Sequence, residues 1–329
     1  MNITVIGDGG WGTAIAMLLN GYGHRVTIWG PFEDYVTEVR ASRENRKFLP
    51  GITLPLEIMI ESDPEIAVHD AELVILASPS KYLRQVCEKF RGLIDSGTKV
   101  VSLTKGLCET THRRMSELAQ SILGLERIAV ISGPSHAEEV ARGIPTAVVA
   151  ASQDPKLAED VQQIFSGDLF RVYTSPDPVG VEIGGAVKNV VAIAVGASDG
   201  LGFGDNTRAA LITRGLQEIV RFGVAQGARP ETFSGLSGVG DLIVTCTSRH
   251  SRNHTVGERL GKGEKIGDIL NSMDMVAEGV WNSKVIHAIS ESSGVEMPIS
   301  GMVYAVCYED FNVRLAVETL MNRSMKAEM

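Results

Sequence analysis

Short apolar runs alternate with helix-like runs through the first half of the chain, and this alternation limits the possible folds more than any other pattern in the sequence. The apolar runs, rich in Val, Ile and Leu, are expected strands at residues 3–7, 25–29, 72–77, 99–104, 127–132, 146–151 and 169–173. Helical patterns, such as those of residues 11–20 and 32–42, separate most of them. Strands that are apolar throughout belong to a sheet covered on both faces. Their alternation with helices predicts crossover units and a largely parallel sheet.

A glycine-rich loop directly follows the first expected strand. Residues 7–12 read Gly-Asp-Gly-Gly-Trp-Gly, which fits the pattern G-x-G-x-x-G between a strand and a helix. In that setting the glycines allow a tight turn and a close approach to a pyrophosphate, while the helix offers free N–H groups to the anion. A plain strand–helix turn is the alternative. We interpret Gly7, Gly9, Gly10 and Gly12 as part of a dinucleotide site in a Rossmann-type domain.

The end of the second expected strand bears on which dinucleotide binds. In NAD sites an acidic residue near this end usually bonds the ribose hydroxyl. Here the strand ends in Trp29-Gly30-Pro31, and Glu33 is the first acid that follows. An arginine suited to a 2′-phosphate is not obvious there either. The predicted cofactor is therefore NAD or NADP.

The pattern changes at residues 174–180, which contain two prolines and no periodicity. Beyond them, residues 184–223 predict two long helices divided by a glycine-rich turn at 199–206, and further helical runs follow. We expect an α/β dinucleotide-binding domain at residues 1–180 and an all-α substrate and catalytic domain at residues 181–329. A chain of 329 residues is long enough for two cores.

One apolar segment of the second domain carries a lysine. Residues 184–197 are small or apolar apart from Lys188 and Asn189. Such a helix belongs in an interior, where an ammonium group is costly unless it is paired or neutral. Lys188 could reach the surface, form a structural ion pair with Asp241, or face an interdomain cleft as a general base. In the cleft, burial lowers its pKa and a nearby aspartate raises it.

Other polar residues follow the carboxyl ends of expected strands, where ligands bind in open α/β sheets. Ser78-Pro79-Ser80 predicts either a turn with a helix cap or a wall of the cofactor crevice. Lys105 points into the crevice or to solvent, and the pattern alone favours solvent. Ser135 and Glu138 form a capping-box pattern, and we expect His136 to be exposed.

A basic cluster lies at residues 249–254, Arg-His-Ser-Arg-Asn-His, in a chain of net charge −9. It is either a solvated loop or a phosphate clamp, because arginine bonds phosphate oxygens bidentately. The overall acidity disfavours nucleic acid and anionic membranes as partners. The four scattered cysteines favour reduced thiols and no metal site. We expect a cytoplasmic protein, because a signal sequence and an apolar run approaching the ~18 residues of a membrane span are both absent from the sequence.

With these residues assembled, the chain closely resembles the NAD(P)-dependent glycerol-3-phosphate dehydrogenases of bacterial type over nearly its whole length. The segments that carry the resemblance are, in order, GDGGWGTAIA, SLTKGL, SGPSHAEEVA, the run from Gly184 to Gly215, GLSGVGDLIVTCTSRHSRN and AEGV. Members of this family interconvert sn-glycerol 3-phosphate and dihydroxyacetone phosphate by hydride transfer with NAD(P). In bacteria this reaction feeds glycerophospholipid synthesis.

The resemblance also implies roles for individual residues. Lys188 would be the proton acceptor, with Lys105 and Asp241 near the reacting oxygen. The implied substrate-binding residues are Lys105, Gly133, Ser135, Lys188, Asp241, Ser251, Arg252 and Asn253, with Arg252-Asn253 at the phosphate. The implied cofactor contacts are Gly10, Trp11, Lys105, Ala137, Arg252 and Glu278. Bacterial members often carry an arginine after the second strand, where this chain has Pro31-Phe32, and His136 is not a catalytic position in the family.

Two other functions stay open at this point. One is a different β-hydroxyacid or sugar-acid dehydrogenase of the same architecture, which would need a carboxylate pocket. The other is a catalytically silent NAD(P)-binding sensor, against which the intact lysine, aspartate and Arg-Asn elements argue. A homodimer is compatible with the sequence, which does not determine the oligomeric state.

Overall fold

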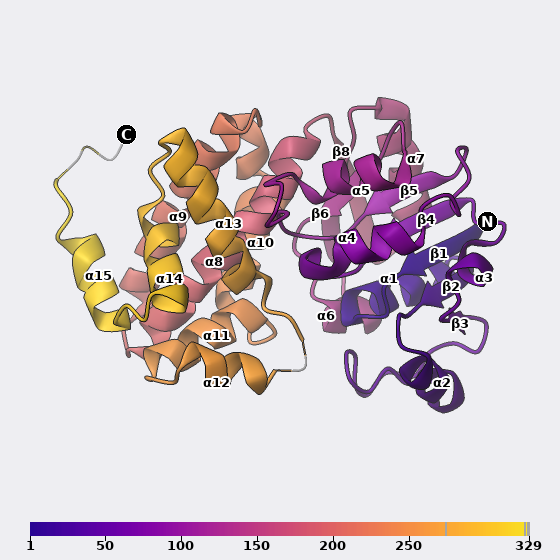
Figure 1. Cartoon of the computed structure of the whole chain (residues 1–329), viewed down its shortest axis with the longest axis horizontal. Coiled ribbons are helices and arrows are strands. Elements are labelled where there is room, and N and C mark those ends of the chain that lie inside the picture. The colour runs from indigo at the N-terminus through magenta and orange to yellow at the C-terminus, as the bar shows by residue number, and fades with distance from the viewer. Residues whose placement is uncertain (274, 326, 328–329) are drawn as a thin grey trace.

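The structure, a computed structural model, describes residues 1–273, 275–325 and 327. In these residues an eight-stranded sheet with helices on both faces is followed by a helical region (Figure 1). The strands are β1 Asn2–Ile6, β2 Arg25–Trp29, β3 Met59–Glu61, β4 Leu73–Leu76, β5 Lys99–Ser102, β6 Ala129–Ser132, β7 Thr146–Ala151 and β8 Phe170–Ser175. This confirms the expected α/β domain followed by an all-α region. The short β3 was missed, since three residues are too few to display a period.

The strand order is β3-β2-β1-β4-β5-β6-β7-β8, and the strands pair in parallel except for the antiparallel pair β6–β7. From β1 the chain runs outward through β2 to β3, and then crosses back to β4 on the other side of β1. The order therefore reverses between β1 and β4. In open α/β sheets ligands bind beyond the carboxyl ends of the strands at such a reversal.

Helices cover both faces of the sheet. Those of the first half are α1 Gly10–Gly21, α2 Glu33–Ser42, α3 Pro64–Val68, α4 Ser80–Lys89, α5 Met115–Leu123, α6 Ala137–Ala141 and α7 Pro155–Phe165. Ile3 and Val5 of β1 belong to the apolar core formed with α1, α2, α6 and α7. Ile6 belongs to the core formed with α3, α4 and α5. Side chains alternate between the faces of a strand, so one apolar strand supplies both cores.

The second half is helical in the described residues. Its α-helices are α8 Pro178–Gly200, α9 Asp205–Ala225, α10 Asp241–Thr247, α11 Arg252–Gly261, α12 Ile266–Asn271, α13 Glu278–Ser293, α14 Pro298–Tyr308 and α15 Val313–Met321. The aspartate before α8 caps it, because Asp177 Oδ1 accepts the backbone N–H of Gly180 at 3.0 Å. Only residues 176 and 177 separate β8 from α8. The segment 174–180 is thus mostly regular structure, although it lacks periodicity.

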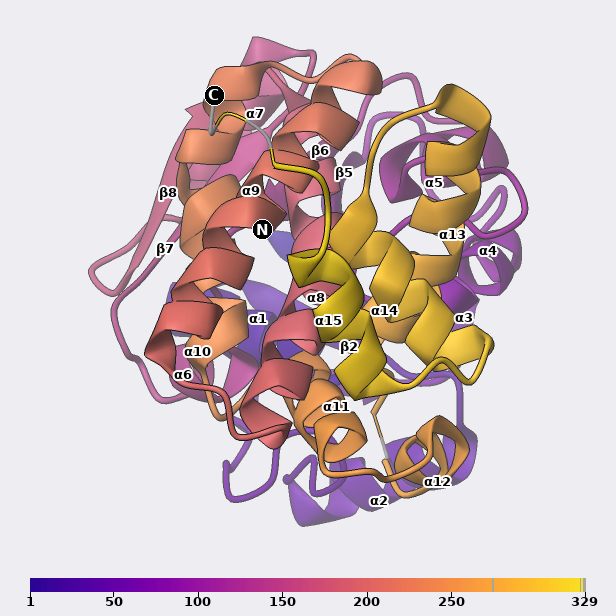
Figure 2. The same ribbon diagram turned by 90° about the vertical axis from the view of Figure 1, so that its left-hand side faces the viewer.

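The α8 helix is the centre of the helical half, with α9, α10, α11 and α13 packed around it (Figures 1 and 2). By length and composition α8 is apolar enough to cross a membrane, yet 89% of its most apolar window is buried inside the protein. It is therefore a core helix. Its glycines permit close packing on α11: a Cβ on Gly196 would collide with the carbonyl of His254, and a Cβ on Gly257 would collide with that of Ile193.

Candidate active site

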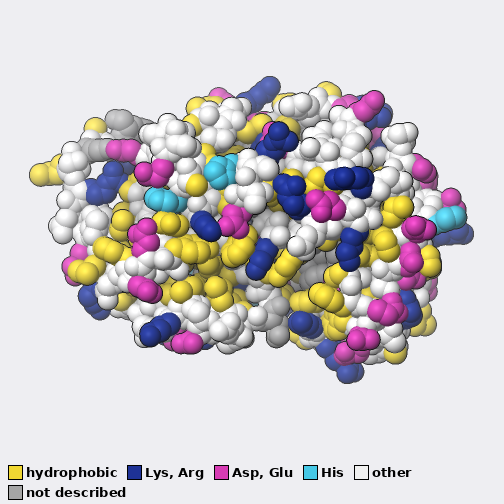
Figure 3. Space-filling model, viewed as in Figure 1, with side chains coloured by type: hydrophobic (Ala, Val, Ile, Leu, Met, Phe, Trp, Pro, Cys, Tyr) yellow, Lys and Arg dark blue, Asp and Glu magenta, His cyan; other side chains and the backbone are white. Residues whose placement is uncertain are grey.

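Charged side chains from both halves of the chain meet where the sheet packs against α8. Lys105 follows β5, Lys188 lies within α8, and Asp241 is the first residue of α10. Lys188 Nζ donates to Asp241 Oδ1 at 2.5 Å, and Lys105 Nζ donates to Asp241 Oδ2 at 2.8 Å. One carboxylate therefore binds two ammonium groups, one from each half. On the face drawn in Figure 3, basic and acidic side chains lie interspersed over the junction of the halves.

Lys188 is enclosed within this cluster, with 6% of its side chain exposed. Its Nζ also donates to Thr245 Oγ1 at 2.7 Å. Burial lowers the pKa of Lys188 to about 8; the charge of Asp241 opposes this effect and that of Lys105 adds to it. An amine with such a pKa populates both protonation states near neutral pH, which proton transfer requires. The lysine does not reach the surface, and the ion pair with Asp241 is present.

Lys105 points into the junction, so the preference for solvent drawn from the local pattern is wrong. Its Nζ also donates to the carbonyl of Gly133 at 3.0 Å, in the loop after β6. These partners come from distant parts of the chain, which a local pattern does not contain. Lys105 is 19% exposed and is the more accessible of the two lysines. Burial alone would raise the pKa of Asp241, but the charges of Lys105 and Lys188 outweigh it and hold that pKa below its usual value.

The structure of the loop after β6 differs from two predictions made from the local sequence, those for Ser135 and His136. Ser135 does not cap α6, which begins at Ala137 after His136; instead Ser135 Oγ donates to the carbonyl of Gly133 at 2.8 Å. Gly133 has a φ of +140°, a backbone conformation that favours glycine at this position. His136 is half-buried rather than exposed, and its Nε2 is enclosed without a hydrogen-bond partner among the described residues. Burial lowers the pKa of His136, and the charge of Lys188 lowers it further.

The N-terminus of α11 lies against α8 beside Lys188. Asn253, in the first turn of α11, is buried and its Nδ2 donates to Asn189 Oδ1 at 2.9 Å. Asn253 Oδ1 accepts the backbone N–H of Gly279, at the start of α13, at 2.8 Å. A Cβ on Gly279 would collide with the carbonyl of Asn189, so glycine is needed for this approach. Because Asn189 follows Lys188 directly, these bonds fix α11 and α13 relative to the lysine.

The remaining residues of the basic cluster have different surroundings. Ser251 is the buried N-cap of α11, and its Oγ accepts the backbone N–H of His254 at 3.2 Å. His254 Nε2 lies 2.7 Å from Asp199 Oδ2. Arg252 is exposed, with Nη1 donating to the carbonyl of Val276 at 2.7 Å. The cluster thus presents one arginine at the N-terminus of a helix, a favourable position for an anion.

Glu278 connects the start of α13 to the start of α4. Its Oε1 accepts the backbone N–H of Ser80 at 2.9 Å, and Oε2 accepts the Ser80 hydroxyl. Ser80 therefore faces the junction of the two halves, and it does not cap α4, whose N-cap is Pro79. Burial raises the pKa of Glu278, while the bonds from Ser80 and the charge of Arg252 oppose that effect. One turn further along, Asn282 Oδ1 accepts the N–H of Leu107 at 3.1 Å.

The glycine loop has the shape that a bound dinucleotide requires. Gly7 has a φ of +126°, and a Cβ there would lie 2.8 Å from the backbone carbon of Ala77. A Cβ on Gly12 would collide with the carbonyl of Gly7. Gly9, the N-cap of α1, borders open space: in the described part of the chain, no atom outside residues 8–10 lies within 4 Å of the position of its absent Cβ. No described side chain caps α1, so its first N–H groups are available to a pyrophosphate.

Two other predicted cofactor contacts surround this helix end. Ala137 Cβ lies 3.7 Å from the position that a Cβ on Gly10 would occupy, because α6 packs on α1. Trp11 Nε1 is enclosed without a hydrogen-bond partner in the described part of the chain. The start of α4 and the loop after β5 are also in contact, since a Cβ on Gly106 would lie 2.6 Å from Ser80 Cβ. The glycine loop, Ser80 and Lys105 thus lie along one edge of the sheet.

Thr245 is the residue of the cluster that the sequence analysis missed. Besides accepting from Lys188, its Oγ1 donates to the carbonyl of Asp241 at 2.6 Å. Asp241 and Thr245 stand four residues apart on α10 and therefore share a face of the helix. The sequence signal for Thr245 is a hydroxyl side chain four residues after Asp241. This signal is useful only if residues 241–247 are first predicted to be helical.

Comparison with known families covers both halves. Residues 2–158 match the N-terminus of NAD-dependent glycerol-3-phosphate dehydrogenase, and residues 177–318 match its C-terminus. The chain belongs to the NAD(P)-dependent glycerol-3-phosphate dehydrogenase family. The resemblance drawn from six sequence motifs is thereby confirmed, and so is the Rossmann-type assignment of the N-terminal domain.

Individual members of this family are similar in sequence to this protein over its whole length. The glycerol-3-phosphate dehydrogenase (NAD(P)+) of Geobacillus thermodenitrificans is 48% identical, covering 100% of this chain and 96% of the relative. That of Chlorobium phaeobacteroides is 46% identical, covering 100% and 99%. The crystal structure of glycerol-3-phosphate dehydrogenase from Coxiella burnetii has a TM-score of 0.95 and 38% identity, covering 98% of this chain and 99% of that chain. The two-part architecture is therefore that of a dehydrogenase of this family.

Proposed function

We propose that the protein interconverts sn-glycerol 3-phosphate and dihydroxyacetone phosphate with NAD(P), feeding glycerophospholipid synthesis. The observation that carries the proposal is the cluster of Lys188, Asp241 and Lys105 at the junction of the two halves, with one enclosed amine of pKa about 8. Membership of the dehydrogenase family supports the same reaction.

In this proposal residues 1–180 bind the dinucleotide, and residues 181–329 bind the substrate and move the proton. The pyrophosphate lies on Gly9–Gly12 at the open end of α1, and Ala137 and Glu278 contact the cofactor. When bound, the nicotinamide accepts or donates the hydride. Trp11 Nε1 is enclosed and has no hydrogen-bond partner among the residues that the structure describes, which supports binding of a polar group nearby.

Lys188 and Lys105 act on the oxygen of the reacting carbon. In oxidation, neutral Lys188 accepts the hydroxyl proton as the hydride leaves the carbon. In reduction, both ammonium groups polarise the ketone and stabilise the developing oxyanion, an effect worth about 3–4 kcal/mol per donor at such sites. Asp241 keeps both nitrogens in place, with Thr245 as the further partner of Lys188 and Gly133 that of Lys105.

The substrate phosphate binds at Ser251, Arg252 and Asn253, at the N-terminus of α11. Replacing Arg252 with alanine is expected to raise KM for dihydroxyacetone phosphate about 10- to 100-fold, because a charged hydrogen bond contributes about 1.5–3 kcal/mol. Steady-state kinetics at fixed cofactor measures the change. The matched control is Arg249→Ala, because Arg249 is an exposed arginine of the same cluster. This variant should leave KM near its native value. An unchanged KM in Arg252→Ala would refute the clamp.

The pH dependence follows from the pKa of Lys188. In the oxidation direction kcat/KM is expected to rise with pH and to level off above about 8, because the neutral amine is the base. In the reduction direction the rate should fall above the same pH, since the protonated amine is the donor. Initial rates between about pH 6 and 10 in both directions measure these profiles. Two flat profiles would contradict the assignment of Lys188.

A substrate panel separates the proposal from its rivals. Reduction of dihydroxyacetone phosphate is followed with NADH and NADPH in parallel, beside non-phosphorylated keto acids and sugar acids. Turnover confined to the triose phosphate is the expected result. Turnover of a carboxylate substrate would favour another hydroxyacid-type dehydrogenase, and cofactor binding without any turnover would favour a sensor. We also expect a cytoplasmic location and include a homodimer among the assemblies to test by light scattering.

A further inference from the structure

The end of β2 lacks the acidic residue that usually hydrogen-bonds the adenosine ribose in NAD sites. A neighbouring loop places a carboxylate at the same position. Gly30 directly follows β2. A Cβ built on Gly30 would lie 2.5 Å from Asp8 Oδ2 and 2.9 Å from Asp8 Cγ. The Asp8 carboxylate, which comes from the glycine loop after β1, therefore lies where a side chain at position 30 would begin.

A side chain at position 30 and the Asp8 carboxylate cannot occupy the same space. Besides Asp8, a Cβ on Gly30 would meet Val36 Cγ2 at 2.9 Å, so the space beside Gly30 is already filled. An acid at position 30 would have to displace the Asp8 carboxylate. The two residues are thus alternative sources of one negative charge at the same place, and this chain uses the residue in the glycine loop.

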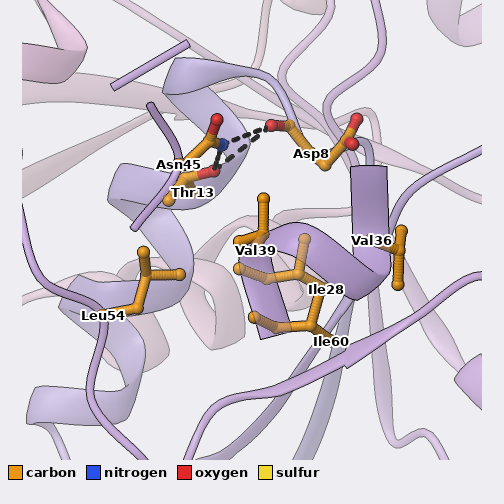
Figure 4. A pocket seen from close by; sticks show the side chains of 8 residues that line it. All are labelled: Asp8, Thr13, Ile28, Val36, Val39, Asn45, Leu54 and Ile60. Atoms are coloured by element: carbon orange, nitrogen blue, oxygen red, sulfur yellow. Dashed lines mark hydrogen bonds between the residues drawn. The ribbon is translucent and has the colours of Figure 1, made fainter. Parts of the chain in front are cut away.

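The backbone of Asp8 is held firmly. Its carbonyl accepts Asn45 Nδ2 at 2.7 Å and Thr13 Oγ1 at 3.4 Å. Figure 4 shows both bonds, above a small cavity lined by apolar side chains of β2, α2 and β3, with the Asp8 carboxylate turned away from Asn45 and Thr13. The loop is therefore fixed before any ligand binds, which lowers the entropic cost of binding.

The carboxylate itself is left short of partners. Asp8 is half-buried, and its Oδ2 is enclosed without a hydrogen-bond partner among the described residues. Burial raises the pKa of Asp8 to about 6, a hydrogen bond and the charge of Lys47 opposing the shift. The group is thus mainly ionised at neutral pH, and an enclosed carboxylate oxygen without a donor is costly. A ligand hydroxyl that donates to the accessible part of this carboxylate would stabilise its ionised form.

We propose that Asp8 accepts a hydrogen bond from the 2′-hydroxyl of the adenosine ribose and repels a 2′-phosphate, so that this chain prefers NAD(H) to NADP(H). The inference rests on the proposed function, because it places the cofactor on the glycine loop. A ribose hydroxyl can donate to a carboxylate, whereas a 2′-phosphate adds negative charge at short range. Lys47 is the nearby cation that would act in the opposite sense.

The test is direct binding without substrate. Calorimetry measures the affinity of the full chain for 5′-AMP and for 2′,5′-ADP, which differ only in the 2′-phosphate, and fluorescence titration measures NADH and NADPH. We expect the native protein to bind 5′-AMP and NADH at least about tenfold more tightly than their 2′-phosphorylated counterparts. Equal affinities for the two members of each pair would overturn the inference.

Variants test whether the preference for NAD(H) over NADP(H) depends on Asp8. Asp8→Ala should weaken NADH binding about tenfold and abolish the preference. Adding Gly30→Asp and Val36→Ala to Asp8→Ala should restore it, because the new side chain then occupies the space that the Asp8 carboxylate and Val36 Cγ2 fill in the native protein. Asp34→Asn, an exposed acid in the first turn of α2, controls for loss of charge alone. An unchanged preference in Asp8→Ala would overturn the inference, as would an equal loss in Asp34→Asn.

The outcomes also separate this inference from the proposed function. If neither adenylate binds while circular dichroism and the thermal midpoint stay native-like, the dinucleotide site itself is wrong. If both bind with equal affinity, the site stands and only the role of Asp8 fails. A midpoint within a few degrees of the native value in each variant shows that the altered loop still folds.

Discussion

Replacing Lys188 with alanine is expected to lower kcat by about 10³- to 10⁴-fold while cofactor affinity stays near its native value. The variant loses both the proton acceptor and one of the two cations that stabilise the oxyanion. Asp241 keeps Lys105 as its partner, so the cluster does not leave a carboxylate without a cation. Steady-state kinetics with dihydroxyacetone phosphate and fluorescence titration of NADH measure the two effects separately.

Near-normal turnover in Lys188→Ala would reject the base assignment. Lys284→Ala is the matched control, since Lys284 is a half-exposed lysine of the same helical half, paired with Glu109 at 2.7 Å. It should retain native kcat. Partial recovery of Lys188→Ala by added primary amines would separate a chemical role of the lysine from a purely structural one.

Replacing Asp241 with asparagine is expected to reduce both activity and stability. The side chain is 1% exposed and binds two ammonium groups, which without the carboxylate would lie close together, buried and uncompensated. Removing one partner of a buried ion pair costs about 3–5 kcal/mol, and the free energy of unfolding in urea should fall by that order. The pKa of Lys188 should fall below about 8, because the charge that now raises it is gone.

The control for Asp241→Asn is the same substitution at Asp268, an exposed aspartate of α12, which should change the unfolding free energy by less than about 0.5 kcal/mol. A second readout is the oxidation profile, whose rise should move to lower pH in Asp241→Asn. Native stability together with an unmoved profile would contradict the arrangement of charges inferred here.

The errors of the local predictions share one cause. The immediate neighbours of Lys105 favour a solvent-exposed side chain, and those of Ser135 predict a helix cap. In the structure Lys105 bonds a carboxylate 136 residues away, and Ser135 bonds Gly133. Thr245 was missed because its significance depends on contact with Lys188, 57 residues earlier. A local pattern indicates the chemistry available to a residue. Its contact partner, however, can lie far away in the sequence and depends on the tertiary fold.

The strand–helix alternation, the position of the glycine loop, the apolar α8 segment and the family could all be predicted from the sequence, because these depend on periodicity and on order along the chain. The resemblance also grouped Lys105, Lys188 and Asp241, but the tertiary structure was needed to show that the Asp241 carboxylate binds both lysines and that the Asp8 carboxylate lies at the end of β2. Burial and pKa depend on the atoms that surround a charge in space. Packing of the sheet edge against α8 supplies those atoms, and no stretch of the chain contains them on its own.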